Sequence, residues 1–154
     1  MELSDILDPG AVRVFGTLSS KKRLFQDLGD IAAGAYGLNA SDVVDALQER
    51  ESLGPTGVGQ GVALPHARLD GLEQVVGAFM RLEKPMDFDS VDRQPVDLVF
   101  ALFAPRDSGV DHLKALALVS RTLRNGSVCD KLRANDDPAA LHAVLTEFPA
   151  IQAA

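Results

Sequence analysis

A histidine follows a short apolar run and a proline near the end of a glycine-rich stretch, residues 51–67 (ESLGPTGVGQGVALPHA). The run Val62-Ala63-Leu64 predicts a buried strand, and Pro65, which has no amide hydrogen, is expected to end its pairing. His66 is therefore expected at the end of a strand, beside a loop whose alternating glycines permit tight turns. Such a position holds an imidazole rigidly within reach of a partner, and its neutral ring nitrogen can act as a nucleophile.

The glycines of this stretch do not form a nucleotide-binding pattern. A dinucleotide fingerprint needs a helix directly after the glycines, whereas a strand and a proline follow here. A phosphate loop ends in Gly-Lys-Ser/Thr, which the sequence lacks. The segment Gly54-Pro55-Thr56-Gly57 instead predicts a turn, with proline second and glycine fourth. From the residues alone, His66 has a second interpretation, as a half-buried loop histidine without chemistry.

The whole stretch resembles the signature of the type-2 enzyme IIA domains of the bacterial phosphoenolpyruvate:sugar phosphotransferase system. That signature starts at an acidic or amide residue, here Glu51, and reaches Val58-Gly59 after six intervening residues. Two residues later it continues as Val62–Ala67 (VALPHA), so that every constrained position is filled. The resemblance implies that His66 is the phosphorylated residue.

Two further segments, residues 50–54 (RESLG) and 88–98 (FDSVDRQPVDL), resemble the nitrogen-regulatory branch of this family. The resemblance covers the chain from about Leu3 to Phe148. It implies that an HPr-like phosphocarrier (NPr) donates the phosphoryl group, and that targets such as potassium transporters or sensor kinases are then regulated. Two alternatives are a sugar-specific IIA of the fructose or mannitol type, which passes phosphate to a IIB domain, and a pure interaction module switched by phosphorylation.

Two other side chains are candidates for assisting the transfer. His112 lies in the first turn of a predicted helix, where free amides and the helix dipole favour a phosphate, although it could also be an exposed histidine without contacts. Arg50 could bind two phosphate oxygens at once, or merely suit a helix C-terminus. The resemblance places a histidine and an arginine at these positions beside the phosphorylated histidine. By the same resemblance, Nε2 of His66 is the expected nucleophile.

For several other residues, a role in the site is less strongly indicated. Arg68 is a second cationic candidate, and the Thr56 hydroxyl could donate to phosphate, although turn formation explains Thr56 equally well. His142 is expected on the surface without a role. Phe79 and Met80 are expected in the core. Four apolar residues near the two histidines are candidates for a surface that docks the carrier: Leu69, Leu72, Val110 and Leu113. Leu69 and Leu72 are also candidates for the core.

The composition predicts one soluble cytoplasmic domain over residues 1–154. A net charge of −7 and a pI of about 4.8 argue against nucleic-acid binding, which needs a basic face. Cys129 is the only cysteine, which fits a reducing compartment, and we interpret it as a packing residue. No apolar run approaches the roughly 20 residues of a membrane helix. No cofactor is expected, nor a metal, because His-x-x-x-His and Cys-x-x-Cys spacings are absent.

The hydrophobic pattern interleaves strands and helices, which predicts an α/β sandwich with a mixed β-sheet flanked by helices. The resemblance implies the same architecture. Strands are expected at 11–15, 62–64, 75–82 and 96–104, the last being central because it is continuously apolar. Helical segments are expected at about 3–7, 20–36, 40–50, 109–124, 127–133 and 138–148. Ser108 and Asp111 predict a capping box, Asp8-Pro9-Gly10 a break after the first helical turn, and Lys84-Pro85 the end of the third strand.

Overall fold

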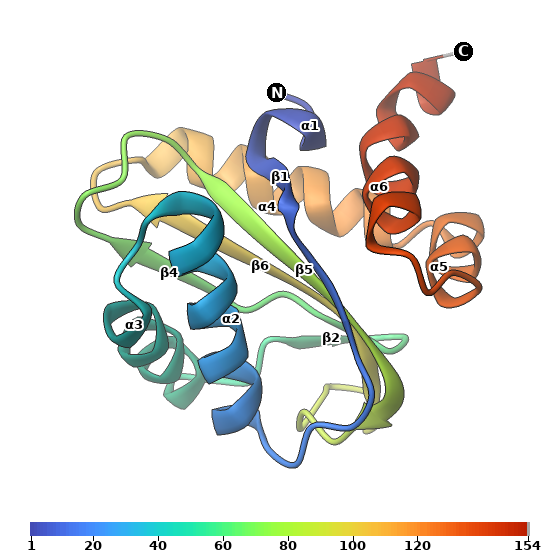
Figure 1. Cartoon of the computed structure of the whole chain (residues 1–154), viewed down its shortest axis with the longest axis horizontal. Helices are drawn as coiled ribbons and strands as arrows, with labels where there is room; N and C mark the ends of the chain where they lie inside the picture. Colours follow the sequence, from blue (N-terminus) through green and yellow to red (C-terminus); the bar gives the residue numbers. More distant parts are fainter. Residues whose placement is uncertain (154) are drawn as a thin grey trace.

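The structure, a computed structural model, describes the backbone of residues 1–153 and the side chains of residues 1–147. Its strands are β1 (Leu7–Phe15), β2 (Gly57–Gly59), β3 (Val62–Ala63), β4 (His66–Leu69), β5 (Val76–Met86) and β6 (Val96–Pro105). Its helices are α1 (Leu3–Ile6), α2 (Lys21–Tyr36), α3 (Ala40–Ser52), α4 (Gly109–Leu123), α5 (Gly126–Arg133) and α6 (Pro138–Ala153). Figure 1 shows α2 and α3 in front of the sheet and α4 behind it, which confirms the predicted sandwich.

The strand β6 is the centre of a six-stranded mixed sheet with the order β1-β5-β6-β3-β2. It pairs antiparallel with β5 and parallel with both β3 and β4, which lie one after the other along the same edge. Every residue of β6 except Asp97 is buried. A strand covered on both faces and paired on both edges must be apolar throughout, so the prediction of a central strand from composition is confirmed.

The connection between β3 and β4 differs from the prediction that His66 ends a strand. Pro65 interrupts the pairing because it has no N–H, but its carbonyl accepts a hydrogen bond from the Leu102 amide (3.0 Å). Pairing then resumes, with His66 opposite Leu102 and Leu69 opposite Pro105. His66 is therefore the first residue of β4, held by the same central strand as β3.

Local capping signals in the first half of the chain are confirmed. Ser20 accepts a hydrogen bond from the Arg23 amide at the start of α2, and Gly37 ends that helix in the left-handed conformation (φ 69°). Asn39 caps α3 in the same way as Ser20 caps α2, through the Asp42 amide (3.0 Å). These caps lie within four residues of the groups they satisfy, so sequence alone reveals them.

Three local predictions are wrong. The strand β1 begins at Leu7, because Pro9 and Gly10 are accommodated in a register shift between Leu7 and Val12. The strand β5 continues through Pro85 to Met86, again across a register shift that needs no amide from the proline. Ser108 precedes α4, but its side chain makes no capping hydrogen bond.

The two C-terminal helices lie close to their predicted positions. Asn125 caps α5 through the Val128 amide (3.1 Å), and Asp137 accepts from the Ala139 amide (3.1 Å) at the start of α6. The Cys129 thiol is buried and donates to the Leu123 carbonyl, as expected of a packing residue. Among the described residues, no helix combines the length and apolar character needed to cross a membrane.

The contact between α2 and α3 depends on the small size of Gly29. A Cβ atom at Gly29 would lie 2.8 Å from the Ala40 carbonyl oxygen and 3.0 Å from Val44 Cγ2, whereas at Gly34, on the exposed side of α2, it would meet nothing within 4 Å. We expect Gly29→Ala to lower the free energy of unfolding by about 1–3 kcal/mol through overpacking. Gly34→Ala should raise it by about 0.5–1 kcal/mol by reducing backbone entropy. Urea unfolding of both variants tests this, and equal shifts of the same sign would contradict it.

Candidate functional site

The imidazole of His66 is held by a hydrogen bond to the backbone two residues earlier. Its Nδ1 lies 2.9 Å from the Leu64 carbonyl oxygen. A carbonyl only accepts hydrogen bonds, so this contact assigns the ring proton to Nδ1 in the neutral histidine and leaves Nε2 with a free lone pair. The turn at Pro65 makes the contact possible, since it brings the Leu64 carbonyl next to the ring of the residue two positions on.

The Arg50 side chain lies against the unprotonated nitrogen of His66. Arg50 is in the last turn of α3, and its Nε donates to Nε2 of His66 (3.3 Å). Its Nη1 donates to the Gly54 carbonyl (2.9 Å), just after the helix. The structure therefore brings together two of the three predicted site residues, with the cation beside the nitrogen lone pair.

His112 completes the group from the first turn of α4. Its ring centroid lies 5.6 Å from that of His66, with the rings tilted by 51°. The side chain is only 5% exposed, so the alternative of an exposed histidine without contacts is wrong. Its Nδ1 is buried and has no hydrogen-bond partner among the described residues. This unsatisfied nitrogen is unusual, because buried polar atoms normally have hydrogen-bond partners.

The surroundings favour the neutral form of both imidazoles. Burial lowers the pKa of His66; the hydrogen bond to Leu64 opposes this, and the charge of Arg50 adds to it. Burial, with smaller contributions from His66 and Arg68, lowers the pKa of His112 to about 4. At neutral pH the site therefore contains two uncharged rings beside a guanidinium, which suits an incoming anion.

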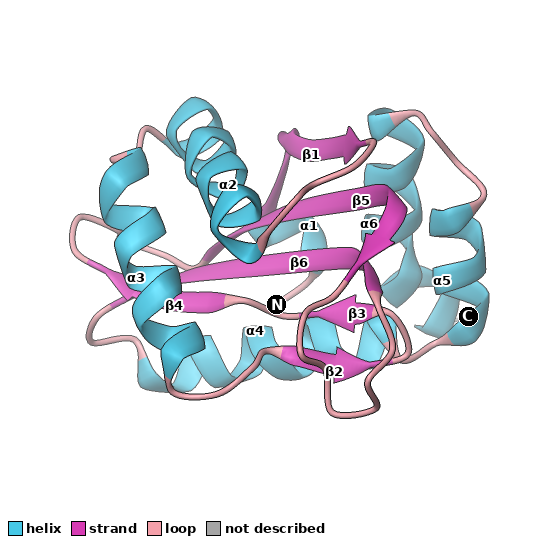
Figure 2. Ribbon diagram, turned by 90° about the horizontal axis from the view of Figure 1, so that it is seen from below, coloured by secondary structure: helices cyan, strands magenta, loops and turns pink. Residues whose placement is uncertain are grey.

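A hollow of about 510 Å³ lies over these groups, where α3, β4 and α4 meet. Figure 2 shows α3 crossing β4, with α4 beside them. Two apolar residues that line the hollow are largely exposed, Leu53 by 80% and Leu113 by 65%. Val110, three residues before Leu113 on α4, is exposed by 67%. We call these three residues the apolar rim. Leu53 directly follows α3 and was not among the sequence candidates, although its place after the Arg50 turn was a usable signal.

Two of the predicted rim residues do not belong to the rim. Leu69 is buried in the core, because it lies on the inward side of β4, and Leu72 is half-buried against the core. Phe79 and Met80 are fully buried, which confirms that they are core residues. A strand alternates its faces, so a single position along β4 decides between core and surface.

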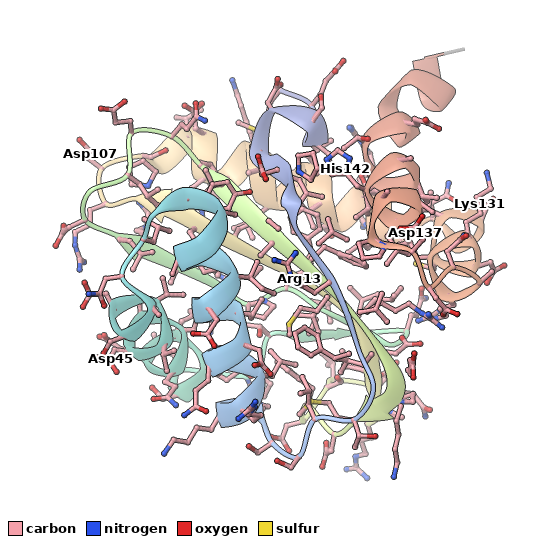
Figure 3. The ribbon with its side chains drawn as sticks, viewed as in Figure 1. Arg13, Asp45, Asp107, Lys131, Asp137 and His142 are labelled. Carbon is pink, nitrogen blue, oxygen red and sulfur yellow. The ribbon has the colours of Figure 1, made fainter. Side chains whose placement is uncertain are left out.

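The remaining candidates have other partners. Arg68 lines the hollow and donates to the Arg106 carbonyl (3.1 Å). The Thr56 hydroxyl donates to Glu51 (2.6 Å), so its proton is already used in a hydrogen bond within the protein. The sequence predicts a surface position without a role for His142; it is half-buried, and its Nε2 lies 2.9 Å from the Leu7 carbonyl oxygen, linking α6 to β1 (Figure 3). Residues 1–147 contain no group of three or more His, Cys, Asp or Glu side chains placed to hold a metal ion.

Comparisons with known proteins show what the chain is similar to. The family profile described as "Phosphoenolpyruvate-dependent sugar phosphotransferase system, EIIA 2" matches residues 5–148. A protein of Bradyrhizobium diazoefficiens named nitrogen regulatory protein is 46% identical over 153 residues, which cover 99% of this chain and 100% of that protein.

Two solved structures share the fold. The nitrogen regulatory protein IIA-Ntr of Neisseria meningitidis superposes with a TM-score of 0.85 at 36% identity, covering 94% of this chain and 99% of that one. The IIA mannitol protein of Escherichia coli gives a TM-score of 0.76 at 18% identity, covering 90% and 97% of the two chains, which shows the likeness of fold alone.

We expect acid to destabilise the protein through His112. Unfolded chains protonate a histidine near pH 6.5, whereas the folded protein resists until about pH 4, so the unfolded state binds more protons between these values. The free energy of unfolding therefore falls as the pH decreases through this window. Urea unfolding between pH 7 and 4.5 should show a weaker pH dependence in His112→Gln than in the native chain. An NMR titration that placed the His112 pKa near 6.5 would contradict the assignment.

Proposed function

Because the chain belongs to the EIIA 2 family of the phosphoenolpyruvate-dependent sugar phosphotransferase system, we propose that it accepts a phosphoryl group on Nε2 of His66 and regulates other proteins according to its phosphorylation state. Proteins of this family carry phosphoryl groups between proteins. The donor in this proposal is an HPr-like phosphocarrier (NPr), itself a phosphohistidine protein. The observation that carries the proposal is the unprotonated Nε2 of His66, fixed by Leu64 and facing Arg50.

In this reaction the phosphoryl group passes from the imidazole of the carrier to the imidazole of His66. The lone pair on Nε2 of His66 attacks the phosphorus, a new N–P bond forms, and the N–P bond to the carrier histidine breaks with its electron pair going to the carrier ring. Positive charge develops on the His66 ring as the bond forms, and the Leu64 carbonyl stabilises it through Nδ1–H. The reaction needs no general base, because Nε2 carries no proton to be removed.

Arg50 and His112 supply the surroundings of the phosphoryl oxygens. In the unphosphorylated protein the Nε–H of Arg50 is aimed at the position that phosphorus will occupy, so a small shift brings the guanidinium to the equatorial oxygens. The His112 ring lies 5.6 Å from the His66 ring, at the start of α4, where a ring N–H can donate to the same group. Arg68, which lines the hollow, adds positive charge.

The regulatory part of the proposal rests on the apolar rim. An exposed apolar surface around a reactive centre suits docking of a partner protein, and phosphorylation places about two negative charges in its middle. Targets that use this face should then discriminate between the two states; potassium transporters and sensor kinases are the proposed classes. The related nitrogen regulatory proteins favour this role over a sugar-specific IIA that passes phosphate to a IIB domain.

We predict that His66→Ala abolishes labelling when the protein is incubated with phosphoenolpyruvate, enzyme I and an HPr-like carrier. The label in the native protein should be acid-labile, because a phosphoramidate is hydrolysed in acid. His142→Ala is the matched control, since His142 lies on α6 and bonds Leu7; it should be labelled fully. Retention of the acid-labile label in His66→Ala would reject the assignment of the nucleophile.

Arg50→Ala and His112→Ala should each slow phosphoryl transfer by about 10²–10³-fold, because each removes one group that stabilises charge in the transition state. Arg50→Lys keeps the charge but loses the planar fork, so its rate should be intermediate. Rapid-quench kinetics with phosphorylated carrier in excess measures these rates. Folded Ala variants that transfer at the native rate would show that these side chains play no part.

Substitutions in the apolar rim should weaken carrier docking without changing the chemistry. We expect Leu53→Ser and Leu113→Ser each to raise KM for the phosphorylated carrier by about tenfold, with kcat unchanged. Val91→Ser is the control, because Val91 is 84% exposed in the loop between β5 and β6, outside the hollow. Carrier-induced amide shifts centred outside residues 50–72 and 108–116 would place the docking face elsewhere.

A further inference from the structure

We propose that Glu51 is a positioning residue that, by closing the loop after α3 onto Thr56, fixes Arg50 against His66. This inference rests on the proposed function, since it assigns Glu51 a role in the same transfer. Sequence resemblance gives Glu51 only as the first position of a signature. The structure adds its contacts, which lead to both reacting groups.

Both oxygens of the Glu51 carboxylate accept hydrogen bonds. Oε1 accepts from the Thr56 hydroxyl (2.6 Å), while Oε2 accepts from the Thr56 amide (3.1 Å) and from Lys21 Nζ (2.8 Å). The Glu51 side chain is only 9% exposed. Lys21 also reaches Asp89 (3.1 Å) and lies 4.8 Å from the centre of the Phe88 ring. Charge-assisted hydrogen bonds of this kind, shielded from water, hold a loop firmly.

The loop closed in this way, residues 53–56, holds both Arg50 and His66. On one side, the Gly54 carbonyl accepts from Nη1 of Arg50 (2.9 Å). On the other, the Thr56 carbonyl accepts from the Leu64 amide (2.9 Å), and Leu64 in turn orients the His66 ring. A displacement of Thr56 would therefore change the position of the guanidinium relative to Nε2.

The hydrogen bonds of Glu51 also prevent its carboxylate from pairing with Arg50. Arg50 and Glu51 are neighbours at the end of α3, and a free carboxylate there would attract the guanidinium away from a neutral imidazole. Because Thr56 and Lys21 donate to both oxygens of Glu51, Arg50 donates instead to the Gly54 carbonyl and to His66. The same network thus anchors the loop and keeps the arginine available for phosphate.

The test compares one substitution of Thr56 that removes the hydroxyl group with one that keeps it. Thr56→Val keeps the shape but removes the bond to Glu51 Oε1, and we expect it to slow transfer by about 10–100-fold through misplacement of Arg50. Thr56→Ser restores the hydroxyl and should transfer within about threefold of the native rate. Glu51→Ala should be at least as slow as Thr56→Val. Asp97→Asn, which breaks the remote pair with Arg133 (2.9 Å), should leave transfer unchanged.

A double-mutant cycle separates positioning from a general structural effect. If Glu51 and Thr56 act through Arg50, Thr56→Val should slow transfer little or not at all in an Arg50→Ala background. Equal slowing in both backgrounds would overturn the proposal. So would a native rate in Thr56→Val.

A second readout needs no phosphoryl transfer. Hydrogen exchange of the Arg50 Nε–H, followed by NMR in the unphosphorylated protein, should be faster in Thr56→Val than in the native chain and in Thr56→Ser. Unchanged exchange would overturn the positioning role. If the native protein takes up no phosphoryl group, the proposed function fails, and this exchange measurement alone decides the role of Glu51.

Discussion

The hydrogen bond between Nδ1 of His66 and the Leu64 carbonyl is the interaction on which the site depends. It decides which ring nitrogen keeps its proton, and so which one is free to react. Pro65 separates the two residues, and the strands β3 and β4 on either side of it both pair with β6. The central strand therefore holds donor and acceptor in one fixed relation, and the geometry of the site follows from the pairing of the sheet.

Burial and charge then act on this geometry in the same direction. The core beneath β4 and the first turn of α4 lower the pKa of both histidines, and Arg50 adds to the effect at His66. A protonated pair of rings 5.6 Å apart beside a guanidinium would repel itself, whereas an incoming phosphoryl group relieves the excess of positive charge. The unphosphorylated site thus presents two neutral imidazoles, one of them the nucleophile, next to the guanidinium of Arg50, which suits an incoming anion.

The sequence was informative where the cause of structure is local. Ser20 and Asn39 cap helices through amides three residues away, and β6 is apolar because both of its faces are covered. The signature around His66 led to the right family because its spacing encodes the β2–β3 hairpin and the turn at Pro65.

The sequence was less informative where distant residues decide the structure. Leu69 turns inward because of its register on β6, and His142 is held by Leu7, 135 residues away in sequence. His112 is buried by the elements around the start of α4, whereas an isolated first helical turn is equally compatible with exposure. Glu51 was noted only as a signature position because its partner Lys21 lies on another helix.

The position of the phosphorus atom on the protein decides whether Nε2 of His66 is the nucleophile. Histidine labelled with ¹⁵N, phosphorylated by the carrier system and observed through phosphorus–nitrogen coupling, distinguishes the two nitrogens of each ring. We predict a single phosphorus coupled to Nε2 of His66, with the proton still on Nδ1. Phosphorus on Nδ1 of His66, or on either nitrogen of His112, would contradict it.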